Sequence, residues 1–236
     1  MSEIKNNLRG SLNPKRIYDW IKYKLEFARN NPDYFYPSGL LVFCGMQGQG
    51  KTLSAVQYIT KLSYAYPKAI IVTNTAISTL NPQSTVIEYD GIRHLKEIEN
   101  GKQGVIYFID EIHLEFNSLE SQNIDIEVMI EISQQRKQRK HIVGTSQVFG
   151  RMAKPLREQI HWAVLCANWF GFLQINKLIR GEESEEKDGK VKSKCRGLFV
   201  WLHSPKLYES YDTYAKMKRY SKEWKGRSRI NDSKYI

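Results

Sequence analysis

One short segment limits the possible folds more than any other part of the sequence. Residues 45–52 have the sequence GMQGQGKT, so a glycine is followed by four variable residues and then by Gly-Lys-Thr. Loops of this pattern wrap a phosphate group, because glycines let backbone amides point inward and the following helix adds the positive end of its dipole. The pattern therefore predicts a buried strand, a phosphate-binding loop and a helix, in that order.

The residues of this loop have separate expected roles. We expect Lys51 to reach the β- and γ-phosphates of ATP and the Thr52 hydroxyl to ligate Mg²⁺. ATP and Mg²⁺ are therefore the expected cofactors. The expected nucleotide-binding residues are Gly45, Met46, Gln47, Gly48, Gln49, Gly50, Lys51, Thr52 and Leu53.

Apolar runs along the chain provide the context that the loop requires. Residues 40–44 (LLVFC) are wholly apolar, which is typical of a buried central strand. After the loop, apolar residues recur at helical spacing until Pro67, and further helices are expected at 14–32 and 124–137. Further strands are expected at 69–73, 85–89, 105–109, 141–146, 160–167, 172–179 and 198–203. Strands that alternate with helices predict an α/β fold with a parallel, doubly wound sheet.

Two carboxylates, Asp110 and Glu111, directly follow the apolar run at 105–109. We expect Asp110 to lie beside the phosphate loop and to hold Mg²⁺, and Glu111 to act as the general base that polarises the attacking water. Hydrolysis of a nucleotide needs both functions. His113 could report the state of the nucleotide, but we favour an ordinary surface role for it.

A polar residue, Gln147, follows the run at 141–146 and could bond both the γ-phosphate and the attacking water. Basic residues stand on both sides of that run. Charge develops on the γ-phosphoryl group during hydrolysis, and an arginine from a neighbouring subunit can stabilise it. The candidates are Arg136, Arg139 and Arg157; contacts to DNA phosphates and a solvated helix end are the alternatives for each of them.

Composition bounds the partners and the size of the protein. The formal net charge of +11 favours a polyanionic partner, with nucleic acid first and an anionic membrane surface second. A length of 236 residues suits one α/β domain with additions and leaves little room for a helicase with two motor lobes. The three cysteines are widely spaced, which is typical of reduced structural thiols.

The expected organisation is an N-terminal helical extension (1–37), a nucleotide-binding domain (38–215) with an exposed hairpin loop near 180–196, and a basic tail (216–236) that is disordered when unbound. The start of the sequence lacks the apolar core of a signal peptide. The apolar stretch at 160–175 is shorter than the roughly 20 residues that span a bilayer, and we expect strands there. We therefore expect the protein in the cytoplasm of a bacterial host cell, or peripheral to a membrane or virion.

Taken together, the motifs resemble those of a known family. GMQGQGKT, TNT at 73–75, VIYFIDEIH, QQRKQRK, HIVGTSQ and PLREQ look like the additional-strand ATPases of the FtsK/HerA superfamily. They are most similar to the Zot-like ATPases (the N-terminal domain of zonular occludens toxin) and to phage genome-packaging ATPases. The resemblance covers roughly residues 38–215.

The resemblance implies a RecA-like P-loop NTPase with a mostly parallel sheet flanked by helices, here with a C-terminal β-hairpin extension. It also implies a hexameric ring that translocates or packages DNA. By position, Lys51 and Thr52 match the nucleotide-binding residues of the family, Asp110 and Glu111 its acidic pair, and Gln147 its polar sensor.

We therefore expect an ATP-hydrolysing motor of phage or mobile-element origin, which forms a ring of identical subunits and contacts the phosphate backbone of DNA with weak sequence preference. A capsid or membrane assembly component is a further candidate partner. The alternatives are a Zot-like assembly or extrusion ATPase at a membrane, a helicase fragment, since residues 110–113 (DEIH) form a DExH box, and an ATP-dependent switch or loader that is not a motor.

Overall fold

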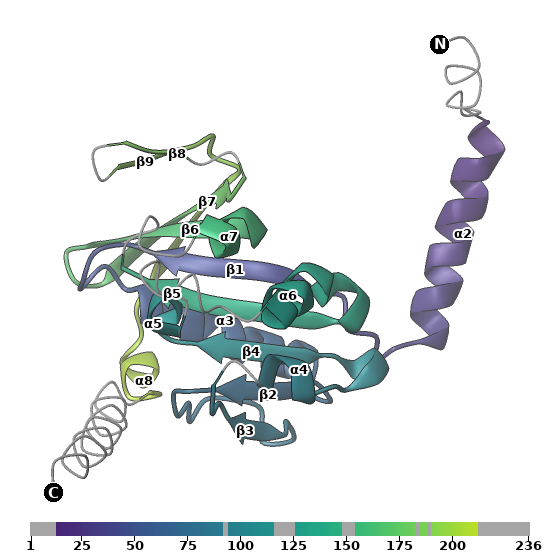
Figure 1. Ribbon diagram of the computed structural model, residues 1–236, viewed down its shortest axis with the longest axis horizontal. Coiled ribbons are helices and arrows are strands. Elements are labelled where there is room, and N and C mark those ends of the chain that lie inside the picture. Colours follow the sequence, from purple (N-terminus) through teal and green to yellow (C-terminus); the bar gives the residue numbers. More distant parts are fainter. Residues whose placement is uncertain are drawn as a thin grey trace, which may run out of the picture. The chain divides into compact units, whose positions relative to one another are not determined.

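The computed structural model in Figure 1 describes residues 13–91, 94–115, 126–147, 154–182, 185–187 and 190–211. The chain divides into two compact units, residues 1–34 and 35–236. The basic tail expected at 216–236 lies outside the described residues. In the part of the chain that is described, no helix is both long and apolar enough to cross a membrane.

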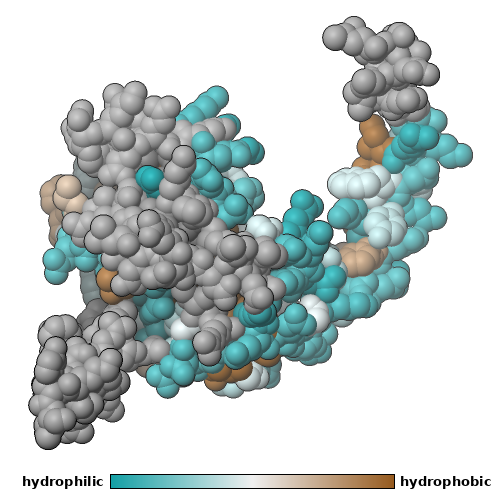
Figure 2. All heavy atoms as spheres, in the orientation of Figure 1, coloured by the Kyte–Doolittle hydropathy of each residue, from teal (hydrophilic) through white to brown (hydrophobic). Residues whose placement is uncertain are grey.

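The first unit contains one long helix, α2 (Pro14–Asn30). The Asn13 side chain caps its start by accepting a hydrogen bond from the Lys15 amide at 3.0 Å, and Pro14 stands in the first turn, where it needs no amide partner. Hydrophobic side chains interrupt the mostly hydrophilic surface of the helix (Figure 2). The amphipathic helix expected at 14–32 is therefore present and ends two residues earlier.

The second unit is built on an eight-stranded sheet with the order β10-β7-β6-β1-β5-β4-β2-β3. Its strands are β1 (Gly39–Cys44), β2 (Ile70–Thr73), β3 (Val86–Glu88), β4 (Val105–Ile109), β5 (Lys140–Ser146), β6 (Ile160–Trp169), β7 (Leu173–Arg180) and β10 (Gly197–Leu202). Neighbours from β6 to β3 are parallel, whereas β6, β7 and β10 pair antiparallel. This arrangement confirms the predicted α/β fold with a mostly parallel sheet and a C-terminal hairpin extension.

Helices cover both faces of this sheet (Figure 1). On one face, α3 (Lys51–Ala65) and α8 (Pro205–Tyr208) pack on strand residues such as Phe43 and Phe108. On the other, α4 (His94–Glu97), α5 (Ile112–Glu115) and α6 (Ile126–Gln138) pack against the strands through Leu95, Ile112 and Ile132. Burying one such side chain stabilises the fold by about 2 kcal/mol. A strand that is covered on both faces buries all of its side chains, so the strands with continuous apolar runs take the central positions.

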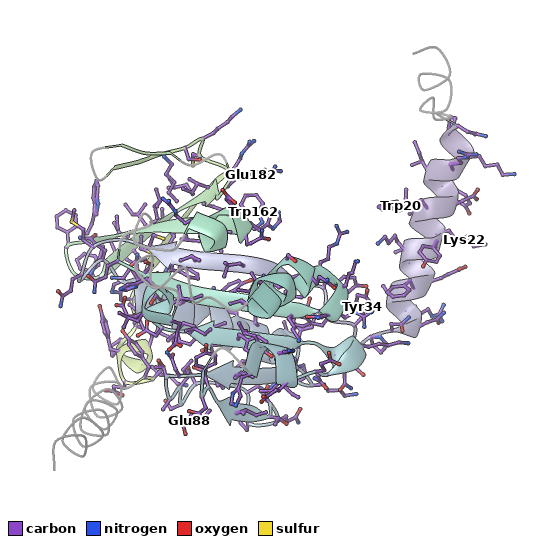
Figure 3. The ribbon with its side chains drawn as sticks, viewed as in Figure 1. Trp20, Lys22, Tyr34, Glu88, Trp162 and Glu182 are labelled. Carbon is purple, nitrogen blue, oxygen red and sulfur yellow. The ribbon has the colours of Figure 1, made fainter. Side chains whose placement is uncertain are left out.

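The antiparallel extension carries its own polar contacts. Trp162 of β6 lies under the guanidinium group of Arg180 of β7, 5.6 Å from the ring centroid, and Arg180 also pairs with Glu182 at 2.9 Å (Figure 3). Within the region expected to be a loop near 180–196, β8 (Glu185–Lys187) and β9 (Lys190–Lys192) form a short two-stranded ribbon.

Several short elements lack the length that apolar periodicity needs to predict them. They are α4, α5, α8, the 3₁₀ helix η1 (Gly101–Gln103) and the β8–β9 ribbon. Helix α7 (Lys154–Gln159) precedes β6. Cys44 and Cys166 are buried, as expected of structural thiols, while Cys195 is exposed.

Candidate active site

The phosphate-loop segment connects the end of β1 to the start of α3. Gly50 caps the helix with a left-handed backbone (φ 72°), and a Cβ there would lie 2.1 Å from Gln174 Oε1. A Cβ at Gly45 would lie 2.8 Å from the carbonyl oxygen of Cys166. Both positions therefore require glycine, because strands β6 and β7 support the loop at close range.

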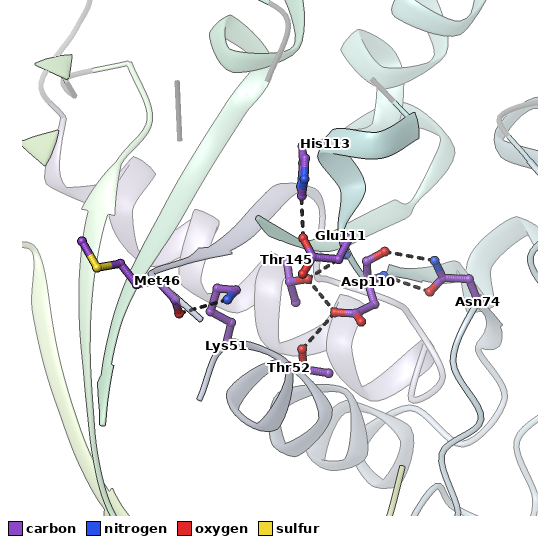
Figure 4. A network of polar contacts seen from close by, with 8 residues as sticks. All are labelled: Met46, Lys51, Thr52, Asn74, Asp110, Glu111, His113 and Thr145. Atoms are coloured by element: carbon purple, nitrogen blue, oxygen red, sulfur yellow. Dashed lines mark hydrogen bonds and ion pairs between the residues drawn. The ribbon is translucent and has the colours of Figure 1, made fainter. Parts of the chain in front are cut away.

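Lys51 is the first residue of α3 and is only 7% exposed. Its ammonium group donates a hydrogen bond to the Met46 carbonyl oxygen across the loop, at 3.1 Å (Figure 4). The ammonium group is thus held at the start of a 15-residue helix, where a phosphate would meet both this charge and the helix dipole. Of the other expected binding residues, Leu53 is buried in the core, which leaves its backbone for a ligand, and the Met46 side chain is 76% exposed.

Asp110 directly follows β4 and is the centre of the polar network in Figure 4. Its Oδ1 accepts hydrogen bonds from the hydroxyl groups of Thr52 (3.0 Å) and Thr145 (2.6 Å). Asn74 holds its backbone, because the amide of Asp110 donates to Asn74 Oδ1 (2.9 Å) and Asn74 Nδ2 donates to the Asp110 carbonyl (3.1 Å). A carboxylate and hydroxyl oxygens in one place form the hard-oxygen ligand set that suits Mg²⁺.

Sequence reasoning missed Thr145 and Asn74 as site residues. Thr145 is the next-to-last residue of β5, and Asn74 follows the last residue of β2. Both strands neighbour β4 in the sheet, and parallel strands end at a common edge. A usable signal is present, since the expected strands at 69–73 and 141–146 both end in polar residues, but the strand order is needed to turn this signal into a prediction.

Glu111 has a left-handed backbone, with φ at 56°. That conformation costs a non-glycine residue on the order of 1–3 kcal/mol and recurs where function demands it. The Glu111 amide donates to the Thr145 hydroxyl at 2.8 Å, and its Oε2 lies 3.1 Å from Nδ1 of His113. The His113 side chain is only 11% exposed, so it is not the ordinary surface residue that we favoured; it contacts the expected general base.

Gln147 lies at the same edge of the sheet as the loop. It follows Ser146, which pairs with Cys44 and whose carbonyl oxygen accepts a hydrogen bond from the Gly45 amide at 3.4 Å. Its expected contacts with the γ-phosphate and the attacking water stay a prediction.

The three candidate arginines lie at the other edge. Arg139 precedes β5 and donates to the Gly101 carbonyl oxygen at 3.3 Å, Arg136 is exposed near the end of α6, and Arg157 lies on α7 before β6. Because β5 and β6 run parallel to β1, these residues stand a strand length, about 20 Å, from the loop of their own chain. Action on the site of a neighbouring subunit stays a prediction.

A second polar network, also missed from the sequence, supports the loop from the other side. Gln174 of β7 is fully buried and donates from Nε2 to the Gln49 carbonyl oxygen (3.0 Å) and to Asn176 Oδ1 (2.9 Å). Asn176 in turn bonds the Ser54 hydroxyl on α3. The sequence does contain a signal for this network, because Gln174 and Asn176 are two residues apart on β7 and therefore share the face toward α3.

Neither a protein-family model nor a curated protein sequence matches the chain. Among solved structures, the N-terminal domain of zonular occludens toxin from Neisseria meningitidis matches 75% of this chain and 100% of its own, with 14% identity and a TM-score of 0.51. B204, the DNA-packaging ATPase from Sulfolobus turreted icosahedral virus (11% identity, 72% of this chain and 98% of that one), scores 0.47. Only the first score supports a shared fold. The chain therefore has the fold of the N-terminal domain of zonular occludens toxin, and the resemblance predicted from its motifs is confirmed at the level of the fold.

Proposed function

We propose that the protein is a Mg²⁺-dependent ATPase. One observation carries the proposal: the hydroxyl groups of Thr52 and Thr145 both donate to Asp110 Oδ1, directly beside the phosphate loop and Lys51. An aspartate with a purely structural role would not need to lie beside a phosphate-binding loop. A loop that only bound phosphate would not need a second acidic residue after Asp110. Here Glu111 follows immediately, with its carboxylate against His113.

The residues would divide the work of hydrolysis in a simple way. The loop amides and Lys51 would bind the phosphates, while Thr52 and Asp110 would hold Mg²⁺, which would withdraw charge from the phosphate oxygens. Glu111 takes the proton from the attacking water. The His113 ring nitrogen lies 3.1 Å from one oxygen of that carboxylate, so its ring would limit the orientations that the carboxylate can take.

Steady-state turnover tests this assignment. Glu111→Gln keeps the shape of the side chain and removes the base, so we expect ATP binding to persist and turnover to fall by about 100-fold or more. Lys51→Ala should lose most ATP affinity while the fold survives. Lys61→Ala, an exposed lysine later on the same helix, is the matched control and should change neither. Normal turnover in Glu111→Gln would transfer the role of base to another residue.

At a finer level, we infer that hydrolysis drives movement along DNA by a ring of subunits, in the cytoplasm or at an assembling virion. The +11 charge and the family resemblance support this inference. Contacts with DNA phosphates weaken steeply with salt, so affinity for DNA should fall sharply between low and moderate salt. The turnover rate per subunit should rise when DNA is added. It should also rise with protein concentration, because a higher concentration favours the ring.

An ATP-dependent switch or loader is the competing function. Its turnover would stay slow and would not respond to single- or double-stranded DNA. A monomer in light scattering that hydrolyses ATP at a rate independent of its concentration would contradict the ring, and the three arginines would then be assigned to contacts with DNA.

A further inference from the structure

The turn between β6 and β7 exposes three aromatic side chains next to one another. Trp169 is 56% exposed, Phe170 81% and Phe172 54%. The ring centroids of Trp169 and Phe170 are 6.4 Å apart, and those of Phe170 and Phe172 are 6.2 Å apart. We call residues 169–172 the aromatic tip. Adjacent exposed rings are costly in water, which is a reason to look for a ligand.

The aromatic tip stands beside the phosphate loop and extends beyond it. Cys44 at the end of β1 pairs with Leu165 of β6, four residues before Trp169, so the hairpin continues about 13 Å past the strand that leads into the loop. Asn168, the residue before the tip, donates from its backbone amide to Gln49 Oε1 at 2.8 Å and from Nδ2 to the Gly48 carbonyl oxygen at 3.4 Å. The tip is therefore bonded to the loop at its base.

Further hydrogen bonds hold the tip in place. The Tyr208 hydroxyl donates to the Gly171 carbonyl oxygen at 3.0 Å. The His203 amide donates to the Phe172 carbonyl oxygen at 2.8 Å. The His203 ring contacts the Tyr208 hydroxyl and, at 3.0 Å, Gln174 Oε1. Since Gln174 also bonds the loop, the rings and the loop belong to one connected support, and a ligand that used both would find them arranged in advance.

The position of the acids gives the direction of a bound nucleotide. Asp110 and Glu111 follow β4, which lies beyond β5 on one side of β1, whereas β6 and β7 lie on the other side. The γ-phosphate must face the acids, so the nucleoside leaves the loop on the side of the hairpin. We propose that the aromatic tip is the nucleobase subsite, where a ring of Trp169, Phe170 or Phe172 stacks on the base. This proposal rests on the proposed ATPase function.

Ligands that share a diphosphate and differ in the base test the proposal. Binding of ADP, CDP and pyrophosphate with Mg²⁺ would be measured by calorimetry for Trp169→Ala, Phe170→Ala and Phe172→Ala. Stacking of one base on an aromatic ring corresponds to about tenfold in affinity. We expect at least one variant to bind ADP about tenfold more weakly and pyrophosphate unchanged. The preference for ADP over CDP should shrink in that variant, since the larger base stacks more strongly.

Two controls make the result specific. Phe199→Ala on β10 removes a phenylalanine that is 55% exposed, close to the value for Phe172, but outside the tip, and should change no affinity. Phe170→Tyr keeps the ring and should keep ADP affinity.

Other results would overturn the proposal. Equal losses for ADP and pyrophosphate would mean that the rings shape the loop and do not touch the base. Unchanged ADP affinity in all three variants would also overturn it, and a matching loss of single-stranded oligonucleotide binding would assign the tip to nucleic acid. Full pyrophosphate affinity in Lys51→Ala would instead contradict the ATPase function itself, so the two failures are distinguishable.

Discussion

The two ends of strand β5 bury polar side chains equally well and use them differently. At the amino end, His141 is 5% exposed; its Nδ1 donates to the Gly39 carbonyl oxygen at 2.9 Å, and its Nε2 lies 3.0 Å from the Tyr58 hydroxyl. At the carboxyl end, Thr145 is fully buried and its hydroxyl joins Asp110 Oδ1 to the Glu111 amide. The first set links a helix and two strands, whereas the second joins the Asp110 carboxylate to the backbone of Glu111 beside a phosphate loop. Burial of polar groups alone therefore does not mark the site.

The largest effect that separates the two ends should come from Asp110→Asn. The change keeps the size of the side chain and removes the charge that would hold Mg²⁺. We expect turnover to fall by about 1000-fold, as when a preorganised charge-stabilising group is removed. The midpoint of thermal unfolding should move little or rise, because a carboxylate next to Glu111 is neutralised. Turnover within tenfold of the starting protein would contradict the assignment.

The next largest effect is a loss of stability at low pH, and it arises at the amino end of β5. Burial lowers the pKa of His141 to about 4, while an unfolded chain has the ordinary value of 6.5. Between these two values the unfolded chain binds a proton that the folded protein does not, so the free energy of unfolding falls as the pH falls from 6.5 to 4. The difference corresponds to about 3 kcal/mol.

Urea unfolding at several pH values checks this window. Carboxylates also titrate near its lower end, so the informative quantity is the difference between the starting protein and His141→Asn. The slope against pH should be smaller in the variant. Identical slopes would mean that the pKa of His141 is the same in the folded protein and in the unfolded chain, which would contradict the prediction.

The smallest effect comes from a matched pair. Thr145→Val removes a hydroxyl group at the carboxyl end of β5, and Tyr58→Phe removes the hydroxyl group of α3 that contacts His141 at the amino end. Each should lower the free energy of unfolding by about 1 kcal/mol. Only Thr145→Val should also lower turnover, by about tenfold, because its hydroxyl orients two groups that act on the substrate. Equal turnover in the two variants would contradict the conclusion that only the carboxyl end of β5 serves catalysis.

How far the sequence predicted the molecule depends on whether a feature is local. The phosphate loop, with the strand before it and the helix after it, is contained in one continuous segment, and so are Asp110 and Glu111 behind their apolar run. The contact between Glu111 and His113 occurs where the backbone of Glu111 is left-handed, and a residue pattern reveals neither feature.

The roles of Asn74 and Thr145 depend on the order β1-β5-β4-β2, which sequence alone does not provide. For the same reason, Arg136, Arg139 and Arg157 could be chosen by charge but not placed at an edge of the sheet. The support from β7 could not be predicted either, since Gln174 bonds the loop and His203 bonds Gln174 only after a long connection has folded back.

The backbone of Glu111 has a consequence for evolution and engineering. A glycine or asparagine tolerates its φ of 56° better than glutamate does, so folding alone favours replacing the residue that we assign as the base. Variants selected only for heat resistance should therefore accumulate changes at position 111 and lose turnover as they do. Retention of glutamate there would be a mark of selection for catalysis against the preference of the fold.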